Sequence, residues 1–274
     1  MEYATVQGVE VPAVGLGTWR LTGRECYRAV GTALELGYRH LDTAQAYGNE
    51  RQVGDAVRNA DVDREELFLT TKLDNYSRSY DDVIRATEES LAKLDTDYVD
   101  LLLIHWPNVR IPLRETLAAM NALVDRGAVR HVGVSNFGID RLHRARELSE
   151  YGILADQIHY NPYWEQRSLL EYCRIHDVLA VAYSPLAHGG VLDDPVLRAV
   201  GDRYGKSPAQ VAIRWAIQQP NVVAVPKATS REHLAANLEV FDFELTDAEI
   251  ERIRQPSKAR AMKGYLKEGL RRFV

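Results

Sequence analysis

A segment near the N-terminus, residues 37–54 (GYRHLDTAQAYGNERQVG), presents two side chains that can exchange protons. A predicted strand at Tyr38–Leu41 ends beside the carboxylate of Asp42, and the phenol of Tyr47 follows on a glycine-containing loop. Later apolar runs also end on polar or reactive groups, namely Lys72, His105, Asn136, Gln157, Tyr183 and Lys227. A carboxylate, a phenol, an ammonium and an imidazole brought together would suit acid–base chemistry. One such group at each strand end is typical of the open end of a parallel barrel.

Each of these residues, taken alone, also has a purely structural interpretation. Asp42 and Lys72 could form an ion pair at the ends of two strands, and Tyr47 could be a packed loop aromatic. His105 closes an apolar strand before a Trp-Pro pair, which also suits a buried histidine with hydrogen-bond partners. The residue types alone leave these alternatives open.

Eight strand–helix units are predicted to position these groups. After a hairpin formed by Tyr3–Val6 and Val9–Val11, the predicted strands cover residues 14–18, 38–41, 67–71, 98–104, 129–134, 155–158, 178–182 and 222–225. Amphipathic helical patterns follow the strands. Several strands are near-continuous apolar runs, as expected for parallel strands covered on both faces. We predict an α/β fold, a (β/α)8 TIM barrel with an N-terminal β-hairpin, in a single domain spanning residues 1–274.

The ends and buried faces of several helices can also be predicted. Capping boxes are predicted at Thr22–Glu25, Ser207–Gln210 and Thr246–Glu249, and Asn49 is predicted to cap the helix that begins at Glu50. Two buried faces are predicted, one made of Tyr27, Val30 and Leu34, the other of Val83, Ile84, Thr87, Leu91 and Leu94.

Charge, apolar runs and cysteine usage limit the binding partners and the cellular location that we expect. The net charge of −5 disfavours nucleic acid and anionic membranes as partners. No apolar run approaches the roughly 20 residues of a membrane helix, and the N-terminus lacks the features of a signal peptide, so we expect a cytoplasmic location. Cys26 and Cys173 show no metal-binding spacing and are predicted to be small packed thiols.

The sequence argues against a Rossmann-type phosphate loop and against a histidine metal site. The Gly15-Leu16-Gly17 run does not match a Rossmann fingerprint, because Arg20 stands at the third glycine position. The remaining histidines form no ligand triplet, so no metal is expected and they are predicted to be structural or on the surface: His40, His131, His143, His159, His176 and His188.

Five motifs in order resemble the aldo-keto reductase superfamily. They are residues 37–54, LLLIHWP at 101–107, VGVSNFG at 132–138, AYSPL at 182–186 and VPKATSREHLAANLEVFDF at 225–243. The resemblance runs from GLGTW at 15–19 to about residue 253, and is nearest to prokaryotic 2,5-diketo-D-gluconate reductase-like members. It implies a barrel that binds a nicotinamide dinucleotide without a Rossmann domain. The implied enzyme is an NADP-dependent oxidoreductase that reduces aldehydes, ketoaldehydes or keto sugars to alcohols.

The resemblance implies a catalytic set of Asp42, Tyr47, Lys72 and His105. Carbonyl reduction needs a hydride on carbon and a proton on oxygen, and Tyr47 is expected to give the proton as general acid. A phenol has an ordinary pKa of about 10, and the Lys72 ammonium is expected to lower it. Asp42 is expected to hold Lys72 in place, and His105 to orient the substrate carbonyl.

The same resemblance implies the cofactor contacts. Ser135, Asn136 and Gln157 are expected to bind the nicotinamide carboxamide. Tyr183 is expected to stack on the nicotinamide ring, although a core aromatic is the alternative for this residue. The remaining expected contacts are Ser184, Leu186 and the 187–192 loop at the pyrophosphate, and Lys227, Ser230, Arg231, His233 and Asn237 at the adenosine end.

Two departures from the family pattern bear on cofactor choice. Ala228 replaces the usual serine, and His233 replaces the arginine that contacts the 2′-phosphate. An imidazole contributes little charge at pH 7. The resemblance keeps NADPH as the first expectation, and the two departures leave the use of NADH open.

The substrate pocket is less clearly marked. Trp19, Trp106 and Tyr76 are expected walls, with core packing as the alternative for the tryptophans, and Asn108 is an expected polar contact. The basic tail, with Lys263, Lys267, Arg271 and Arg272, is either a solvated surface or a guide for anionic sugar acids.

The resemblance also implies a small-molecule carbonyl substrate and a monomer. Two alternatives stay open. One is a non-catalytic sensor or partner subunit of the same fold that binds the nicotinamide cofactor. The other is a barrel with unrelated lyase or phosphate chemistry.

Overall fold

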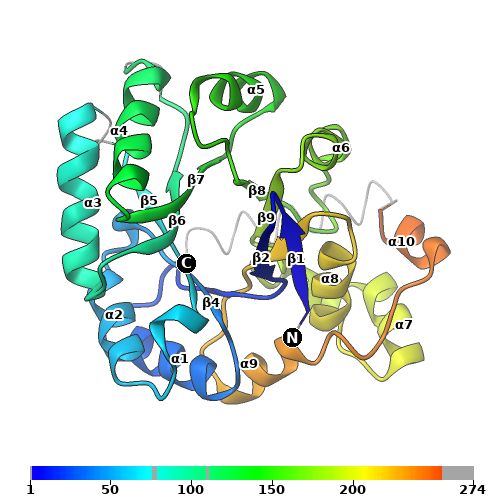
Figure 1. Ribbon diagram of the computed structural model, residues 1–274. Coiled ribbons are helices and arrows are strands. Elements are labelled where there is room, and N and C mark those ends of the chain that lie inside the picture. The colour runs from blue at the N-terminus through cyan, green and yellow to red at the C-terminus, as the bar shows by residue number, and fades with distance from the viewer. Residues whose placement is uncertain (1, 76–78, 109–110, 255–274) are drawn as a thin grey trace.

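Eight parallel strands curl into a barrel in the computed structural model, which describes residues 2–75, 79–108 and 111–254 (Figure 1). Each strand pairs with the next in the chain, and the strands are β3 (Leu16–Gly17), β4 (His40–Asp42), β5 (Phe68–Leu73), β6 (Val99–Ile104), β7 (Val129–Ser135), β8 (Ala155–His159), β9 (Leu179–Tyr183) and β10 (Val222–Ala224). The last strand returns to the first, because the Gly15 amide donates to the Ala224 carbonyl (2.8 Å) and the Ala224 amide to the Ala13 carbonyl (2.9 Å). The predicted parallel barrel is confirmed.

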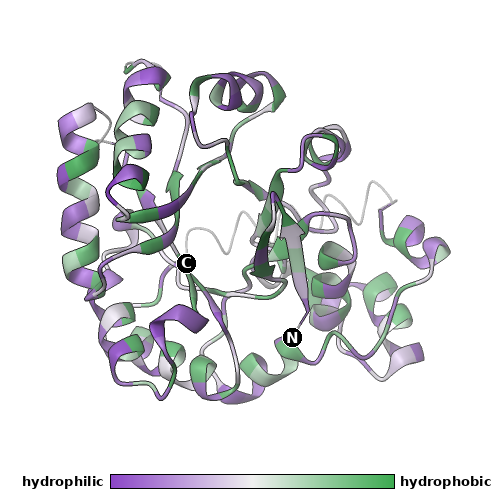
Figure 2. Cartoon of the chain, in the orientation of Figure 1, coloured by the Kyte–Doolittle hydropathy of each residue, from purple (hydrophilic) through white to green (hydrophobic). Residues whose placement is uncertain are grey.

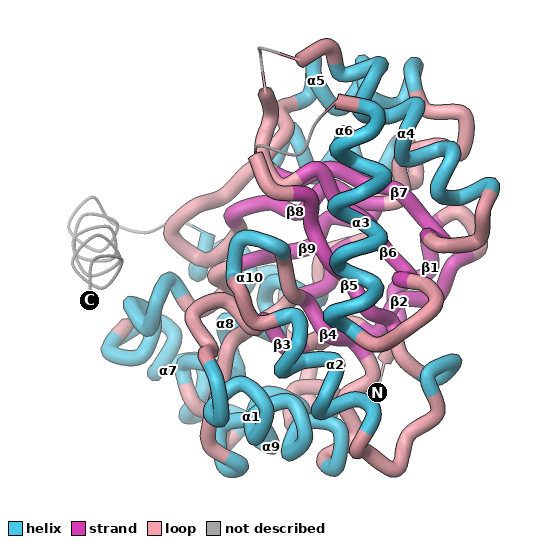
Figure 3. The backbone as a smooth tube through the Cα atoms, turned by 90° about the vertical axis from the view of Figure 1, so that its left-hand side faces the viewer, coloured by secondary structure: helices cyan, strands magenta, loops and turns pink. Residues whose placement is uncertain are grey.

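Helices surround the strands, as the rotated view in Figure 3 shows. They are α1 (Gly23–Glu35), α2 (Glu50–Arg58), α3 (Tyr80–Leu94), α4 (Leu113–Asp125), α5 (Ile139–Leu148), α6 (Arg167–Ile175), α7 (Pro195–Tyr204), α8 (Pro208–Ile217), α9 (Arg231–Leu238) and α10 (Asp247–Arg254). Three short 3-10 helices were not predicted: η1 (Gln45–Tyr47), η2 (Arg64–Glu66) and η3 (Ala187–Asp193). None of the helices in these described ranges is both long and apolar enough to cross a membrane.

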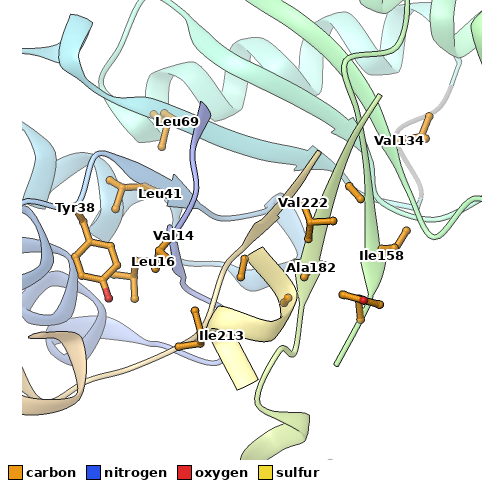
Figure 4. Packing of buried hydrophobic residues seen from close by; sticks show 14 of the residues in the cluster. Val14, Leu16, Tyr38, Leu41, Leu69, Val134, Ile158, Ala182, Ile213 and Val222 are labelled. Carbon is orange, nitrogen blue, oxygen red and sulfur yellow. The ribbon is translucent and has the colours of Figure 1, made fainter. Parts of the chain in front are cut away.

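Two hydrophobic layers hold the barrel together. The outer layer lies between strands and helices, and Figure 4 shows Leu41, Leu69 and Ile158 among its members. The inner layer lies inside the barrel. There Val6 and Val11 of the predicted hairpin, β1 (Tyr3–Val6) and β2 (Val9–Pro12), belong to one cluster with strand residues that include the first residues of β5, β8 and β9, namely Phe68, Ala155 and Leu179. The hairpin therefore closes the end opposite the strands' carboxyl termini.

Figure 2 shows hydrophobic and hydrophilic residues mixed along α3, as expected for a helix with one buried face. In α3 the predicted face of Val83, Ile84, Thr87, Leu91 and Leu94 is buried or half-buried. In α1, Val30 and Leu34 are buried, but the prediction for Tyr27 is wrong, because this side chain is 38% exposed.

Cys26 and Cys173 are free, buried thiols, as predicted, and burial raises the pKa of each to about 12.

Two helix caps form as predicted and two do not. The capping box at Ser207 is complete, and Thr246 and Glu249 also exchange hydrogen bonds. Thr22 makes no side-chain cap, and neither does Asn49. Asn49 instead donates to the carbonyls of Thr18 and Leu21 (2.9 Å each) and accepts from the Thr43 hydroxyl (2.8 Å). The Asn49 amide thus links the loops that follow the neighbouring strands β3 and β4, and these bonds satisfy its buried polar atoms.

Candidate active site

A cavity of about 600 Å³ opens among the carboxyl ends of the strands. It brings together most of the predicted site residues from six strand ends: Asp42, Tyr47, His105, Ser135, Asn136, Gln157, Tyr183, Ser184, Leu186 and Lys227. His233 and Asn237 of α9 also line it, with Trp19 and Trp106. Side chains as far apart in the sequence as Trp19 and Asn237 therefore face one space, because parallel strands present their carboxyl ends on one side.

The Lys72 ammonium lies at the centre of the acid–base group. Its Nζ donates to Asp42 Oδ1 (2.6 Å), to the Thr43 carbonyl (2.8 Å) and to the Tyr47 hydroxyl (3.3 Å). The Tyr47 ring meets the His105 ring edge to face, with centroids 5.8 Å apart. The Lys72 side chain has no exposed surface, whereas Tyr47 and His105 line the cavity. The phenol thus stands between a buried cation and the space where a ligand would lie.

Local structure explains these positions. Asp42 is the last residue of β4, and Lys72 lies two residues beyond its partner Thr70 on the adjacent strand β5. Because side chains alternate along a strand, Thr70 and Lys72 point the same way. The 3-10 helix η1 ends at Gly48, whose positive φ of 66° turns the chain after Tyr47.

The pKa values of Lys72 and Tyr47 are both raised, for different reasons. Burial alone would lower the pKa of Lys72, but Asp42 and Tyr47 outweigh it and the pKa is raised, so the side chain stays an ammonium. Burial raises the pKa of Tyr47, the Lys72 charge lowers it and Asp42 raises it, and the net direction is upward. Lys72 thus lowers the pKa of the phenol as expected, but burial is the larger effect and the pKa of Tyr47 is raised overall.

Gln157 has an unpredicted partner in this group. Its Nε2 donates to Asp42 Oδ2 (2.7 Å), so the two carboxylate oxygens of Asp42 are shared between Lys72 and Gln157. The backbone carbonyl of Gln157 accepts from the Ser135 hydroxyl (2.9 Å). Gln157 therefore supports the acid–base group as well as lining the cavity.

A second network fixes the next strand ends. Asn136 Nδ2 donates to the His105 carbonyl (3.0 Å), and its Oδ1 accepts from the Tyr183 hydroxyl (2.8 Å). Asn136 adopts a positive φ of 63°, a region that asparagine tolerates better than most residues. The rings of Tyr183 and His159 are nearly parallel, with an angle of 9° and centroids 5.3 Å apart.

At the opposite end of the cavity, two predicted contacts lie elsewhere. Ser230 and Arg231 do not line the cavity. The Ser230 hydroxyl caps α9 by accepting from the His233 amide (3.2 Å), and Arg231 pairs with Glu35 of α1 (2.7 Å). Residues at the start of α8, Ser207, Ala209 and Gln210, line the cavity instead. The capping motif at Ser207 marks a helix start, but no signal in the sequence places that start beside the cavity.

The mouth of the cavity is aromatic and partly basic. Trp19 and Trp106 are 36% and 41% exposed, which supports a role in contacting ligands over core packing. The Arg20 guanidinium lies 4.6 Å from the Trp19 ring centroid, and His188 meets Trp19 edge to face at 5.3 Å. Arg20, which was not predicted, lines the cavity. His188 also lines it, although its side chain was predicted to be structural or on the surface; the 187–192 loop that carries it was expected at the pyrophosphate.

Of the remaining predicted residues, one lies away from the cavity, and others lie outside the described part of the chain. Asn108 does not line it and donates to the Asn75 carbonyl (3.4 Å). Tyr76 and the basic tail lie outside the residues that the structure describes. Within residues 2–75, 79–108 and 111–254, no three His, Cys, Asp or Glu side chains are grouped so that they could hold a metal ion.

A family model, described as the aldo/keto reductase family, matches residues 13–258. The chain belongs to the aldo-keto reductase family. It is 40% identical over 248 residues to the methylglyoxal reductase of Escherichia coli (strain K12), covering 89% of this chain and 88% of that protein. It is 41% identical over 258 residues to the morphine 6-dehydrogenase of Pseudomonas putida, covering 89% and 86%. A crystal structure of a candidate 2,5-diketo-D-gluconic acid reductase B aligns with a TM-score of 0.91 at 41% identity, covering 93% and 91%.

Membership makes the chain part of a family of oxidoreductases that use nicotinamide cofactors. The expected resemblance to 2,5-diketo-D-gluconate reductase-like proteins is likewise confirmed.

Proposed function

We propose that this aldo-keto reductase reduces aldehydes, ketoaldehydes or keto sugars to alcohols with NADPH, with Tyr47 as general acid. The single observation that carries the proposal is the Tyr47 hydroxyl, 3.3 Å from the buried Lys72 ammonium in a group that faces the cavity. The names of similar proteins, a methylglyoxal reductase among them, support the substrate class.

The cavity suits an extended nicotinamide dinucleotide. Its volume of about 600 Å³ is in the range of cofactor sites, roughly 300–1,000 Å³. Amide groups of Asn136 and Gln157 lie at one end, where a carboxamide needs both donors and acceptors. Lys227 and His233 of α9 also line the cavity, and the Lys227 ammonium suits a phosphate. The residues present therefore fit the cofactor.

The protein's own groups handle the proton and the orientation. When bound, the cofactor supplies the hydride that the carbonyl carbon accepts. Tyr47 gives its proton to the carbonyl oxygen as negative charge develops there, and the adjacent Lys72 ammonium stabilises the phenolate that remains. His105 donates a hydrogen bond that orients the carbonyl oxygen, and Asp42 holds Lys72 in position.

A cofactor and substrate panel tests the proposal. We expect the purified protein to consume NADPH with methylglyoxal or 4-nitrobenzaldehyde, and to do so more slowly with NADH. Binding of NADPH without turnover of any carbonyl would favour the non-catalytic sensor or partner subunit. An absence of nicotinamide cofactor binding would reject the proposal.

Tyr47→Phe tests the role of the phenol. We expect kcat to fall by about 10²- to 10⁴-fold, the usual contribution of a positioned proton donor, with little change in NADPH affinity. Tyr3→Phe is the matched control, because Tyr3 is 50% exposed on the hairpin and should leave turnover unchanged. Near wild-type turnover of Tyr47→Phe would show that another group gives the proton.

A further inference from the structure

Three aromatic rings stack away from the cavity behind Tyr183. The His159 ring is nearly parallel to the Tyr183 ring (9°), and the Trp164 ring is stacked on His159 at 25°, with centroids 5.3 Å apart in both pairs. Tyr183 lines the cavity, whereas His159 and Trp164 do not. His159 therefore covers one face of the tyrosine ring and leaves the other face as the one that a planar ligand can meet.

Polar contacts fix the middle ring of this stack. The Asn161 amide nitrogen lies 3.1 Å from His159 Nε2, and the Gln166 amide donates to the His159 carbonyl (2.8 Å). Asn161 is fully buried, and its amide nitrogen also donates to the carbonyl of Ser184, the residue after Tyr183 (3.2 Å). The same buried amide thus ties His159 to the chain that carries Tyr183.

The tyrosine ring is held at its other end as well. Its hydroxyl donates to Asn136 Oδ1 at 2.8 Å, which limits movement of the ring in its own plane. That bond alone does not stop the ring from tilting about its Cβ–O axis. A parallel neighbour resists that tilt, because offset-stacked aromatic pairs are favoured over other arrangements.

We infer that His159 is a positioning residue for the nicotinamide cofactor, through the orientation it gives to the Tyr183 ring. The inference rests on the proposed function, because it assigns the cavity-facing side of Tyr183 to the nicotinamide. Loss of the stacked partner is expected to weaken cofactor binding about 2- to 10-fold, the worth of one aromatic pair.

Three variants separate ring stacking from other effects. His159→Leu removes the flat partner, while His159→Phe keeps an aromatic ring and removes the imidazole nitrogens. Isothermal titration of NADPH into the wild type and each variant should show weaker binding for His159→Leu and recovery in His159→Phe. The KM for NADPH should rise in His159→Leu by more than kcat falls. If His159→Leu does not fold, His159→Gln replaces it with the same expectation.

Thermal unfolding of the cofactor-free proteins controls for a general loss of structure. The inference is overturned if His159→Leu binds NADPH as tightly as the wild type, or if His159→Phe binds as weakly as His159→Leu. In either case the proposed function survives, because the wild type still binds and turns over. If the wild type itself binds no nicotinamide cofactor, the proposed function is overturned together with this inference.

Discussion

At the residue scale, Tyr47 is subject to two opposing effects whose balance sets its role. Burial raises the pKa of the phenol and the Lys72 ammonium lowers it, and burial prevails in the protein alone. The phenol therefore keeps its proton throughout the neutral range and is available as a donor. In the proposed mechanism, Lys72 would stabilise the phenolate formed during proton transfer, since its charge is already present and fixed by Asp42.

Asp156 is a second buried acid, and it lies outside the proposed mechanism. It neighbours Gln157 on β8, but its side chain faces away from the cavity, because side chains alternate along a strand. Its Oδ1 accepts from the Phe137 amide at 3.4 Å, and its Oδ2 has no hydrogen-bond partner among the residues described. Burial raises its pKa well above the ordinary value of 3.8.

The sign of this shift predicts how a substitution affects stability. A carboxyl with a raised pKa in the folded state contributes stability below its unfolded pKa, and that stability is lost as the pH rises through the folded pKa. Asp156→Asn keeps the shape without the charge, so we expect it to raise Tm at pH 8 by roughly 2–6 °C. The gain should be smaller at pH 5.

Thermal unfolding at both pH values measures this difference. Asp202→Asn on the exposed surface of α7 is the control, and it should change Tm little at either pH. An equal gain for Asp156→Asn at pH 5 and pH 8 would show that ionisation of Asp156 has no part in the effect.

At the element scale, the packing of helix α9 sets which of its side chains face the cavity. Arg231, its first residue, pairs with Glu35 on α1, while His233, its third residue, lines the cavity. The resemblance implied that Arg231 lies at the adenosine end of the cofactor. The ion pair with another helix, which depends on how α1 and α9 pack, directs it elsewhere.

Cofactor preference should follow this division. His233→Arg places a permanent charge at the cavity, and we expect NADPH affinity to rise about 10-fold with little change for NADH, since a charge-assisted hydrogen bond adds about 1.5–3 kcal/mol. Arg231→Ala should change both affinities less than about twofold, because exposed ion pairs contribute little. Titration of both cofactors measures the ratio. A larger loss of NADPH affinity in Arg231→Ala would place Arg231 at the phosphate.

The helix ends show why local motifs predict some contacts and not others. The Ser207 box forms because both of its partners lie within one turn. The Gln210 amide nitrogen also donates to the carbonyls of Ala236 and Glu239, but its oxygen still accepts from the Ser207 amide. Asn49 has the same local option, but the loops of Thr18 and Leu21 offer it two buried carbonyls. Long-range competition of this kind cannot be judged from spacing.

At the scale of the whole molecule, the parallel barrel is what made the site predictable. Asp42, Lys72 and His105 could be placed together because each ends, or nearly ends, a strand in a closed sheet. Individual side-chain contacts between strands could not be predicted, as the Gln157–Asp42 bond between the non-neighbouring strands β8 and β4 and the stack of His159 on its strand partner Tyr183 show. The upward shift of the Tyr47 pKa could not be predicted from the sequence either, because the burial that causes it depends on the assembled fold.

Closure of the barrel gives a test at this scale. Gly17 ends β3 and lines the cavity, and its amide donates to the Pro226 carbonyl (3.1 Å). A Cβ at this position would lie 2.5 Å from the Val225 carbonyl oxygen, so the two strands must separate to admit one. We expect Gly17→Ala to cost about 1–3 kcal/mol, which lowers Tm by roughly 2–10 °C, and to weaken NADPH binding.

Gly31→Ala is the matched control, because no atom lies within 4 Å of the Cβ it would add in α1. Alanine is the better helix former, so this variant should gain about 0.5–1 kcal/mol and bind NADPH normally. Thermal unfolding and NADPH titration of both variants separate crowding at the seam from the general effect of adding a methyl group. If Gly17→Ala melts at the wild-type temperature and binds NADPH normally, the seam between β3 and β10 must be able to widen, and close approach there is not what closes the barrel.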